Sequence, residues 1–165
     1  MAETENKLGV LFVCLGNICR SPMAEGAFRL AAKNAGLTCE VDSAGTAGYH
    51  VGDPPDWRAV KVAAANCVDI SAATGRQLTA QDFDRFSHIF ALDKANLAGI
   101  KAMQPRGGRA QVAMLMDAVE GREGEAVKDP YYGNIGDFEA VWAEVTQAAD
   151  VLVARFKADA AAARL

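Results

Sequence analysis

One segment near the N-terminus, from Cys14 to Pro22, combines a possible nucleophile, a fixed cation and a turn of backbone amides. The apolar run at 8–13 that precedes it is typical of a buried parallel strand. Within the segment, Ser21 is a good helix N-cap and Pro22 suits the first helical position, and helix-forming residues then continue to a stop at Gly36. The predicted order is strand, loop and helix, with the reactive residues in the loop.

A loop in this position favours the binding of a phosphate-sized anion. The first amides of the helix have no intrahelical acceptors, and the helix dipole adds partial positive charge at the same place. Gly16 allows the backbone to curl so that successive N–H groups converge on one centre. Arg20 adds a planar fork that matches two phosphate oxygens. Cys14 would then lie beneath the phosphorus, in surroundings that favour a thiolate. The segment therefore predicts a phosphate cradle that contains a nucleophile.

Taken singly, Cys14 could be a buried cysteine at a strand end and Arg20 a surface residue on a helix. The full pattern of strand, Cys-x5-Arg-Ser-Pro and helix is rarely met by chance, and it favours the reactive interpretation. Two common nucleotide-binding motifs do not fit, because the turn lacks Gly-x-Gly-x-x-Gly and no Gly-Lys-Ser/Thr follows a glycine loop.

Composition is typical of one globular domain. The 165 residues are 51% hydrophobic, so we expect a single domain over 1–165, with 1–7 and 158–165 frayed. The net charge of -4 and the scattered Lys and Arg argue against nucleic-acid binding. No apolar stretch approaches the roughly 20 residues of a membrane span, and residues 1–7 are too polar and too short for a signal peptide. The prediction is a cytoplasmic protein that binds neither nucleic acid nor membrane.

The cysteines and histidines do not form a metal site in the sequence. The 4 cysteines show no CxxC spacing, and His50 and His88 do not stand at ligand spacing from them. This pattern argues against zinc and against a disulfide framework, and it suits a reducing compartment. We therefore expect no metal.

Strand-like and helix-like segments alternate along the chain. Strands are expected at 8–13, 38–43, 88–92 and 110–115, helices at 23–35, 57–65, 94–104 and about 138–156, and a short capped turn or helix at 79–83. Asp56 is the expected N-cap of the second helix. This alternation predicts a four-stranded parallel sheet with helices on both faces, a three-layer α/β/α fold with a phosphate-binding loop after the first strand. Ligands bind such sheets at the carboxyl ends of the strands, where Cys14 and Asp93 would emerge.

A thiolate that attacks phosphorus needs a general acid to protonate the departing oxygen. Asp129 is the best candidate, because Pro130 restricts it to extended geometry and Gly133 ends the turn. An Asp-Pro pair that merely starts a turn is the simpler interpretation, but the Cys14 loop makes the acid role the better one. Tyr131 and Tyr132 would then flank the pocket and stack on an aromatic leaving group.

Together these motifs resemble the low-molecular-weight protein tyrosine phosphatases over about residues 8–156. The resemblance rests on Cys14 to Pro22 followed by Met23-Ala24-Glu25, on Asp42 to Thr46, on Leu92-Asp93 with Asn96-Leu97, and on Asp129 to Gly133. It implies hydrolysis of phosphotyrosine in protein substrates, and of aryl phosphates, through a cysteinyl phosphate. It implies no cofactor, and its fold is the four-stranded parallel sheet predicted above.

The resemblance also implies roles for individual residues. The phosphate would be bound by Arg20 and by the loop amides of Leu15, Gly16, Asn17, Ile18 and Cys19. Cys14 would be the nucleophile and Asp129 the acid, Ser21 would stabilise the thiolate, and Asn17 would brace the loop. Tyr49 and Tyr131 would wall the pocket. For Cys19 two interpretations stay open: a reversible disulfide partner for Cys14, or a small buried residue that fills space.

The sequence departs from the family pattern at Ala73. Many members carry a histidine there that hydrogen-bonds to the loop asparagine. We therefore expect a softer brace at Asn17.

Other functions stay open on the sequence alone. Arsenate reduction on the same fold would need further cysteines to relay a disulfide, but Cys39 and Cys67 are both expected in the core. A protein-arginine phosphatase resembles this loop but tends to carry threonine where this chain has Ile18, which favours a flat aromatic ring. A non-catalytic phosphopeptide-binding module would need neither Cys14 nor Asp129. We therefore favour a tyrosine phosphatase that acts as a monomer or weak dimer on phosphotyrosine-containing proteins.

Overall fold

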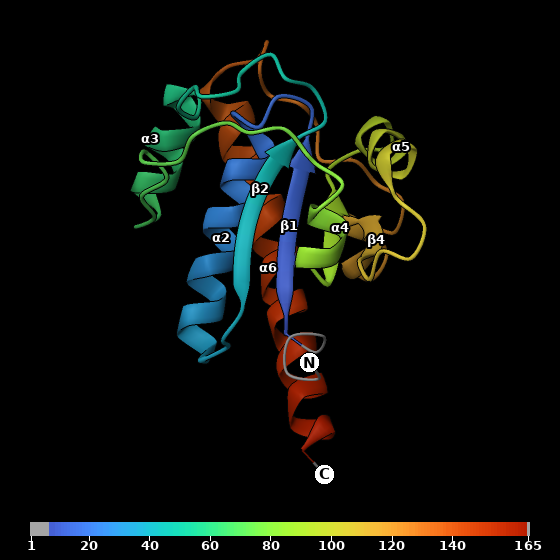
Figure 1. The fold of residues 1–165 in the computed structure, drawn as a ribbon. Helices are drawn as coiled ribbons and strands as arrows, with labels where there is room; N and C mark the ends of the chain where they lie inside the picture. The colour runs from blue at the N-terminus through green and yellow to red at the C-terminus, as the bar shows by residue number, and fades with distance from the viewer. Residues whose placement is uncertain (1–6, 165) are drawn as a thin grey trace.

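The fold is built on short parallel strands that alternate with helices (Figure 1). The computed structural model describes residues 7–164. Its elements are, in order, β1 (Gly9–Cys14), α2 (Arg20–Ala35), β2 (Glu40–Gly45), α3 (Trp57–Ala65), α4 (Asp82–Arg85), β3 (His88–Ala91), α5 (Lys94–Met103), β4 (Gln111–Met114), the 3-10 helix η1 (Leu115–Ala118) and α6 (Ile135–Ala163). The 4 strands lie in the order β2-β1-β3-β4, and every neighbouring pair is parallel. The predicted fold class is confirmed.

Strand β1 separates two hydrophobic cores because its side chains alternate between the faces of the sheet. Val10 and Phe12 belong to the core beneath α2, α3 and α6, whereas Leu11 and Val13 belong to the core beneath α4 and α5. All six residues of β1 are buried, as expected for the central strand of a sheet covered on both faces. Figure 1 shows α2 and α6 on one side of the strands and α4 and α5 on the other.

The long helix α6 closes the larger core. It begins with a capping box, in which Asn134 and Asp137 each accept a hydrogen bond from the backbone N–H of the other. Its Phe138, Trp142 and Phe156 are buried, as the three- and four-residue spacing predicts. The helix packs along α2, and this contact holds the helix that follows the reactive loop.

Two predicted boundaries near the site are wrong. Helix α2 begins at Arg20 with Cys19 in the N-cap position, so Ser21 lies inside the helix and caps nothing. Strand β2 continues to Gly45, beyond the predicted end at residue 43, because it pairs with β1 up to Cys14. At the other end of the chain, α6 continues to Ala163, where fraying is predicted from 158. Fraying of residues 1–6 concerns a segment outside the described residues.

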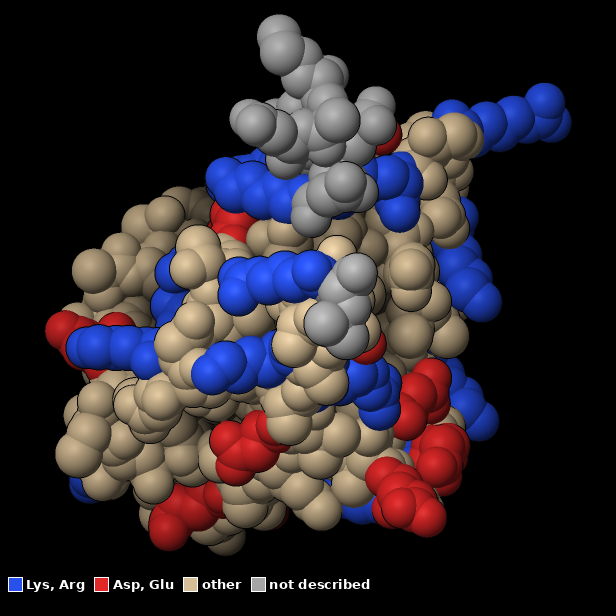
Figure 2. Space-filling model, turned by 90° about the horizontal axis from the view of Figure 1, so that it is seen from below, with Lys and Arg blue, Asp and Glu red and all other residues tan. Residues whose placement is uncertain are grey.

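The two ends of the sheet differ in character. The carboxyl ends of β1 and β2 lie at the top of Figure 1, where the loops gather, and the start of β1 and the last turns of α6 lie below. Figure 2 looks at the lower end, where Lys and Arg side chains gather over the middle of the face and acidic ones lie toward its edges. At this end of the sheet, Arg109 donates to the backbone oxygens of Lys7 and Arg85. Its side chain therefore joins the segments that precede β1 and β3.

Among residues 7–164, no helix is both long enough and apolar enough to cross a bilayer.

Phe28 tests the larger core. Its ring centroid lies 5.6 Å from that of Phe12 and 6.3 Å from that of Phe156, and the side chain is fully buried. We expect Phe28→Ala to lower the free energy of unfolding by about 3 to 5 kcal/mol, because it leaves a cavity between α2, β1 and α6. Urea denaturation measures the change. The control Met103→Ala, at a partly exposed side chain, should cost less than about 1 kcal/mol. Equal losses would contradict this description of the core.

Candidate active site

The loop between β1 and α2 is held from outside by its carbonyl groups. The oxygens of Cys14, Leu15 and Ile18 accept hydrogen bonds from the amides of Thr46 (2.9 Å), Ala47 (3.0 Å) and Asp56 (2.8 Å). The C=O and N–H of one planar peptide point in opposite directions. The following N–H groups are therefore turned away from these segments, as a cradle of amides around an anion requires.

Gly45 makes this anchoring possible. A Cβ atom at Gly45 would lie 2.7 Å from the Leu15 carbonyl oxygen and 3.2 Å from that of Ala47. Any larger residue would push the β2 end away from the loop. The glycine is therefore required by the close approach of two backbones and not by its own dihedral angles.

The Cys14 sulfur is the acceptor at the centre of the loop. It lies 3.0 Å from Ser21 Oγ and accepts from the Asn17 backbone N–H at 3.3 Å. Ser21 Oγ itself accepts from Asn17 Nδ2 at 2.8 Å, and its one proton has two acceptors within reach, the sulfur and the Ala44 carbonyl oxygen at 3.5 Å. Cys14 is 3% exposed. The Ser21 hydroxyl and the Asn17 backbone amide are thus the polar neighbours of this sulfur.

Asn17 is fully engaged, which overturns the basis for a softer brace. Its backbone has φ 60, a left-handed conformation that asparagine tolerates better than most residues. Besides Ser21, its Nδ2 donates to Ser43 Oγ at 3.0 Å, and its Oδ1 accepts from the backbone N–H of Arg76 at 3.0 Å. A backbone amide and a serine thus hold the Asn17 side chain, which argues against the softer brace, and the rigidity of the loop itself stays a prediction.

Ser43, Glu25 and Arg76 support the loop from behind, and the sequence analysis did not identify them as part of the site. Ser43 Oγ donates a hydrogen bond to Glu25 Oε1 at 2.7 Å. Arg76 makes ion pairs with Asp42 and Asp82, each at 3.0 Å. Burial lowers the pKa of Arg76, but the hydrogen bonds that it donates to Asp82, together with the negative charges of Asp82 and Asp42, outweigh this effect, and the net pKa is raised. The segment whose backbone holds Asn17 is thus fixed by a permanently charged side chain.

The Asp93 carboxylate fixes the direction of the Arg20 side chain. The sequence analysis identified Asp93 only as a residue at the end of a strand. Arg20 Nη1 donates to Asp93 Oδ2 at 2.7 Å and to the Val127 carbonyl at 2.9 Å, and Arg20 is 3% exposed. Asp93 is itself fixed as the N-cap of α5, because its Oδ1 accepts from Asn96 N at 2.7 Å. Arg20 Nη2 lies 3.7 Å from Asp129 Oδ2, beyond hydrogen-bond distance. The guanidinium therefore stands between the phosphate loop and the candidate acid.

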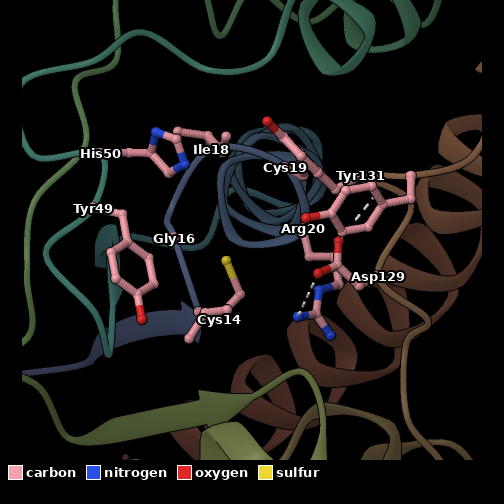
Figure 3. Close-up of a pocket in the computed structure, with 11 residues that line it drawn as sticks. Cys14, Gly16, Ile18, Cys19, Arg20, Tyr49, His50, Asp129 and Tyr131 are labelled. Carbon is pink, nitrogen blue, oxygen red and sulfur yellow. Dashed lines mark hydrogen bonds and ion pairs between the residues drawn. The ribbon is translucent and has the colours of Figure 1, made fainter.

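These groups meet at a cavity of about 260 Å³ (Figure 3). Figure 3 shows the Cys14 sulfur pointing into it, with Tyr49 on one side and Asp129 and Tyr131 on the other. The predicted pocket and loop residues that line it are Cys14, Leu15, Gly16, Ile18, Cys19, Arg20, Tyr49, Asp129, Tyr131 and Tyr132. Asn17 belongs to the loop but is not among the residues that line the cavity, and its backbone N–H donates to the sulfur. The structure thus brings the predicted nucleophile, cation, acid and aromatic walls into one place.

His50 is a lining residue that the sequence analysis missed. Its Nδ1 lies 3.1 Å from Asp53 Oδ2, and a Cβ atom at Gly16 would lie 3.0 Å from His50 Cδ2. The ring therefore packs directly over the loop glycine. Nothing in its local sequence signals this contact, because it depends on how the segment after β2 folds over the loop.

The other cysteines differ in environment. Burial, followed by the charge of Asp56, raises the pKa of the Cys19 thiol, which stays protonated at neutral pH. Cys39 is half-buried, and burial raises its pKa too. The prediction that Cys67 lies in the core is wrong: it follows α3 at φ 65 and is exposed. Over residues 7–164, no group of three or more His, Cys, Asp or Glu side chains could hold a metal ion.

Alkylation tests the cysteine environments. With iodoacetamide at neutral pH we expect modification of the exposed Cys67 and the cavity-lining Cys14, while Cys19 stays unmodified. Only the thiolate reacts, and a raised pKa leaves less thiolate at any given pH. Cys19 should therefore stay resistant into the alkaline range, where an ordinary thiol reacts. Peptide mass spectrometry measures each site, and equal rates at Cys19 and Cys67 would contradict the assignment.

Ser43→Ala tests the layer behind the loop. It removes an acceptor for Asn17 and a donor for Glu25 in a buried place. We expect a loss of about 1 to 3 kcal/mol in the free energy of unfolding, and faster hydrogen exchange at residues 15–19. The control is Ser71→Ala, whose exposed hydroxyl bonds only within its own turn to Asp69. If both variants behaved alike, the brace would have no effect on the loop.

Comparison with known proteins agrees with this geometry. Residues 9–162 match the family model described as low molecular weight phosphotyrosine protein phosphatase. The protein of that name from Saccharomyces cerevisiae is 38% identical over 151 residues, which cover 88% of this chain and 93% of the yeast protein.

Two solved structures are similar over most of the chain. The crystal structure of a protein tyrosine phosphatase from Entamoeba histolytica, with Hepes in the active site, has a TM-score of 0.87, with 32% identity over 93% of this chain and 99% of that one. The Drosophila arginine phosphatase DARP has a TM-score of 0.84, with 31% identity over 90% of this chain and 97% of that one. The chain therefore belongs to the low molecular weight phosphotyrosine protein phosphatase family.

Proposed function

We propose that this chain hydrolyses phosphotyrosine in protein substrates, and aryl phosphates, in two steps at Cys14. In the first, the Cys14 thiolate attacks phosphorus, the bond from phosphorus to the aryl oxygen breaks, and Asp129 gives its proton to the departing phenolate. In the second, Asp129 takes a proton from water, the water oxygen attacks phosphorus, and the bond from sulfur to phosphorus breaks to release phosphate. No cofactor enters either step.

The observation that carries the proposal is the position of the Cys14 sulfur. It faces the cavity from the floor of the amide loop, with Ser21 and Asn17 donating to it and Arg20 beside it. Arg20 and the amides of Leu15 to Cys19 would hold the three non-bridging phosphate oxygens and stabilise their charge as the bond to sulfur forms. Asp129, from a loop beyond Arg20, would meet the leaving oxygen on the side away from the sulfur.

The walls of the cavity favour an aromatic substrate. Ile18, Tyr49 and Tyr131 offer apolar and aromatic faces above the loop, and such faces pack well against a flat ring. A relative of this fold carries the name arginine phosphatase, so phosphoarginine is the second candidate substrate. We favour phosphotyrosine because a guanidinium gains less from Ile18 than a phenyl ring does.

Two other functions find less support in the site. An arsenate reductase would need a cysteine relay, but Cys67 lines a different cavity, between α2 and the segment after α3. A module that only binds phosphopeptides would have no use for a nucleophile and an acid on opposite sides of the ligand. The remaining predictions are unchanged: a cytoplasmic monomer or weak dimer that binds neither nucleic acid nor membrane.

Leaving-group dependence tests the acid. We expect Asp129→Ala to lower kcat/KM for phenyl phosphate by about 100-fold or more. The loss for p-nitrophenyl phosphate should be less than about tenfold, because its leaving group needs little protonation. Steady-state kinetics measure both, since kcat/KM reports every step up to departure of the phenol. The control Asp150→Asn, at an exposed carboxylate on α6, should change neither value.

Three outcomes would overturn parts of the proposal. An equal loss for both substrates would remove Asp129 from the acid role. Hydrolysis of phosphoarginine with no hydrolysis of phosphotyrosine would exchange the substrate class. Thiol-dependent arsenate reduction without aryl phosphatase activity would replace the reaction itself.

A further inference from the structure

Arg58, in the first turn of α3, joins two loops that are far apart in the sequence. Its Nε and Nη2 donate to the two carboxylate oxygens of Asp56 at 3.0 and 2.9 Å. Its Nη1 donates to the carbonyl oxygen of Gly133 at 3.0 Å, and its Nη2 also donates to that of Tyr131 at 2.9 Å. One planar guanidinium therefore holds its own helix N-cap and the backbone of the loop that carries Asp129.

Tyr131 transmits this contact to the candidate acid. Its backbone N–H donates to Asp129 Oδ1 at 3.1 Å, while its backbone C=O accepts from Arg58. Because these two groups belong to adjacent peptides around one Cα, fixing the carbonyl restricts the direction of the N–H. Asp129 Oδ2 is then left as the oxygen that faces Arg20.

The other end of the bridge is fixed to the loop of the nucleophile. The backbone N–H of Asp56 donates to the Ile18 carbonyl at 2.8 Å, and its carboxylate caps α3 by accepting from Arg58 N at 2.9 Å. Burial raises the pKa of the Asp56 carboxyl, but hydrogen bonds from Arg58 outweigh it, and the net pKa is lowered. Asp56 thus stays charged, and the pair spans from the phosphate loop to the acid loop.

Ring contacts keep the guanidinium in place. Its Cζ lies 4.4 Å from the ring centroid of Phe138 and 5.9 Å from that of Tyr131. Phe138 is fully buried at the start of α6, so it offers a rigid surface.

On the upstream side of Asp129, the backbone N–H of Val127 donates to the Leu92 carbonyl, and its carbonyl accepts from Arg20. The acid loop is therefore anchored on both sides of Asp129, and Arg58 supplies the downstream anchor.

We propose that Arg58 is a positioning residue for the general acid: it holds the carbonyls of Tyr131 and Gly133 so that Asp129 reaches the leaving oxygen. The inference rests on the proposed function, because it matters only if Asp129 protonates a leaving group. Arg58 is not among the residues that line the cavity, and it contacts the acid loop through the backbone carbonyls of Tyr131 and Gly133. Lysine cannot replace it, because an ammonium cannot chelate the Asp56 carboxylate and reach both carbonyls in one plane.

A merely structural role for Arg58 makes a different prediction from a positioning role. If Arg58 only stabilised the fold, its loss would lower the amount of active protein and reduce turnover of every substrate by the same factor. If it positions Asp129, its loss should copy the Asp129→Ala pattern, with a larger penalty for a poor leaving group than for a good one.

The experiment compares Arg58→Ala and Arg58→Lys with wild type on phenyl phosphate and p-nitrophenyl phosphate. We expect kcat/KM for phenyl phosphate to fall by about tenfold or more, and kcat/KM for p-nitrophenyl phosphate by less than about threefold. Arg58→Lys should not restore the ratio. The control Arg85→Ala removes an arginine that also joins a carboxylate, Glu40, and a ring, Phe86, far from the acid loop. It should leave the ratio unchanged.

A double-mutant cycle with Asp129→Ala completes the test. Once the acid is gone, Arg58→Ala should not change the ratio further, because the two substitutions remove the same function. An equal loss for both substrates, an unchanged ratio, or a further change in the Asp129→Ala background would overturn the proposal.

If Arg58→Ala does not fold, Arg58→Lys carries the same comparison. Failure of the proposed function looks different, since wild type would then not hydrolyse p-nitrophenyl phosphate, or Cys14→Ser would retain the activity.

Discussion

The interaction on which the site depends is the pair of hydrogen bonds that end at the Cys14 sulfur. The Asn17 amide donates to this atom at the end of the central strand, and the Ser21 hydroxyl lies 3.0 Å from it. A buried thiolate without such donors would carry a large desolvation cost. Here the Asn17 amide belongs to the same turn that opens toward the cavity, and Ser21 lies in the first turn of the helix that follows, so the predicted oxyanion cradle and the partners of the sulfur are built from one short segment.

That turn cannot hold its shape alone. Asn17 adopts a left-handed conformation, and the loop carbonyls need partners from outside. The parallel register of β1 and β2 supplies two of them, because Gly45 lies beside Cys14 and the next residues, Thr46 and Ala47, then reach the carbonyls of Cys14 and Leu15. The third partner is the backbone N–H of Asp56. The backbone N–H of Arg76 donates to Asn17 Oδ1, and Glu25 accepts from the Ser43 hydroxyl that in turn accepts from Asn17. Each of these bonds contributes only about 1 kcal/mol net, but leaving one buried partner unpaired costs about 1 to 3 kcal/mol. The network is therefore sensitive to single substitutions.

The sequence predicts those parts of the site that consist of short motifs of consecutive residues. Cys14 to Pro22 and Asp129 to Gly133 are short segments whose chemistry depends on local spacing, and the structure brings them to one cavity. Four further residues contact these motifs from other segments of the chain: Ser43, Arg76, His50 and Arg58. Their contacts depend on strand register and loop packing, which no local sequence pattern specifies.

Local preferences also misled where tertiary contacts compete with them. Ser21 has the propensity of an N-cap, but its hydroxyl contacts Cys14 and Asn17, and the helix starts two residues earlier than predicted, at Arg20. Cys67 follows an apolar helix face, but the chain turns there in a left-handed conformation and exposes it.

The most direct test of this account is to trap the intermediate. The protein is mixed with p-nitrophenyl phosphate and quenched in acid within its first turnovers, and its peptides are then examined by mass spectrometry. The account predicts a phosphoryl group on Cys14, absent when the substrate is omitted. Turnover with no phosphorylated peptide, or with the phosphoryl group on any other residue, would contradict it.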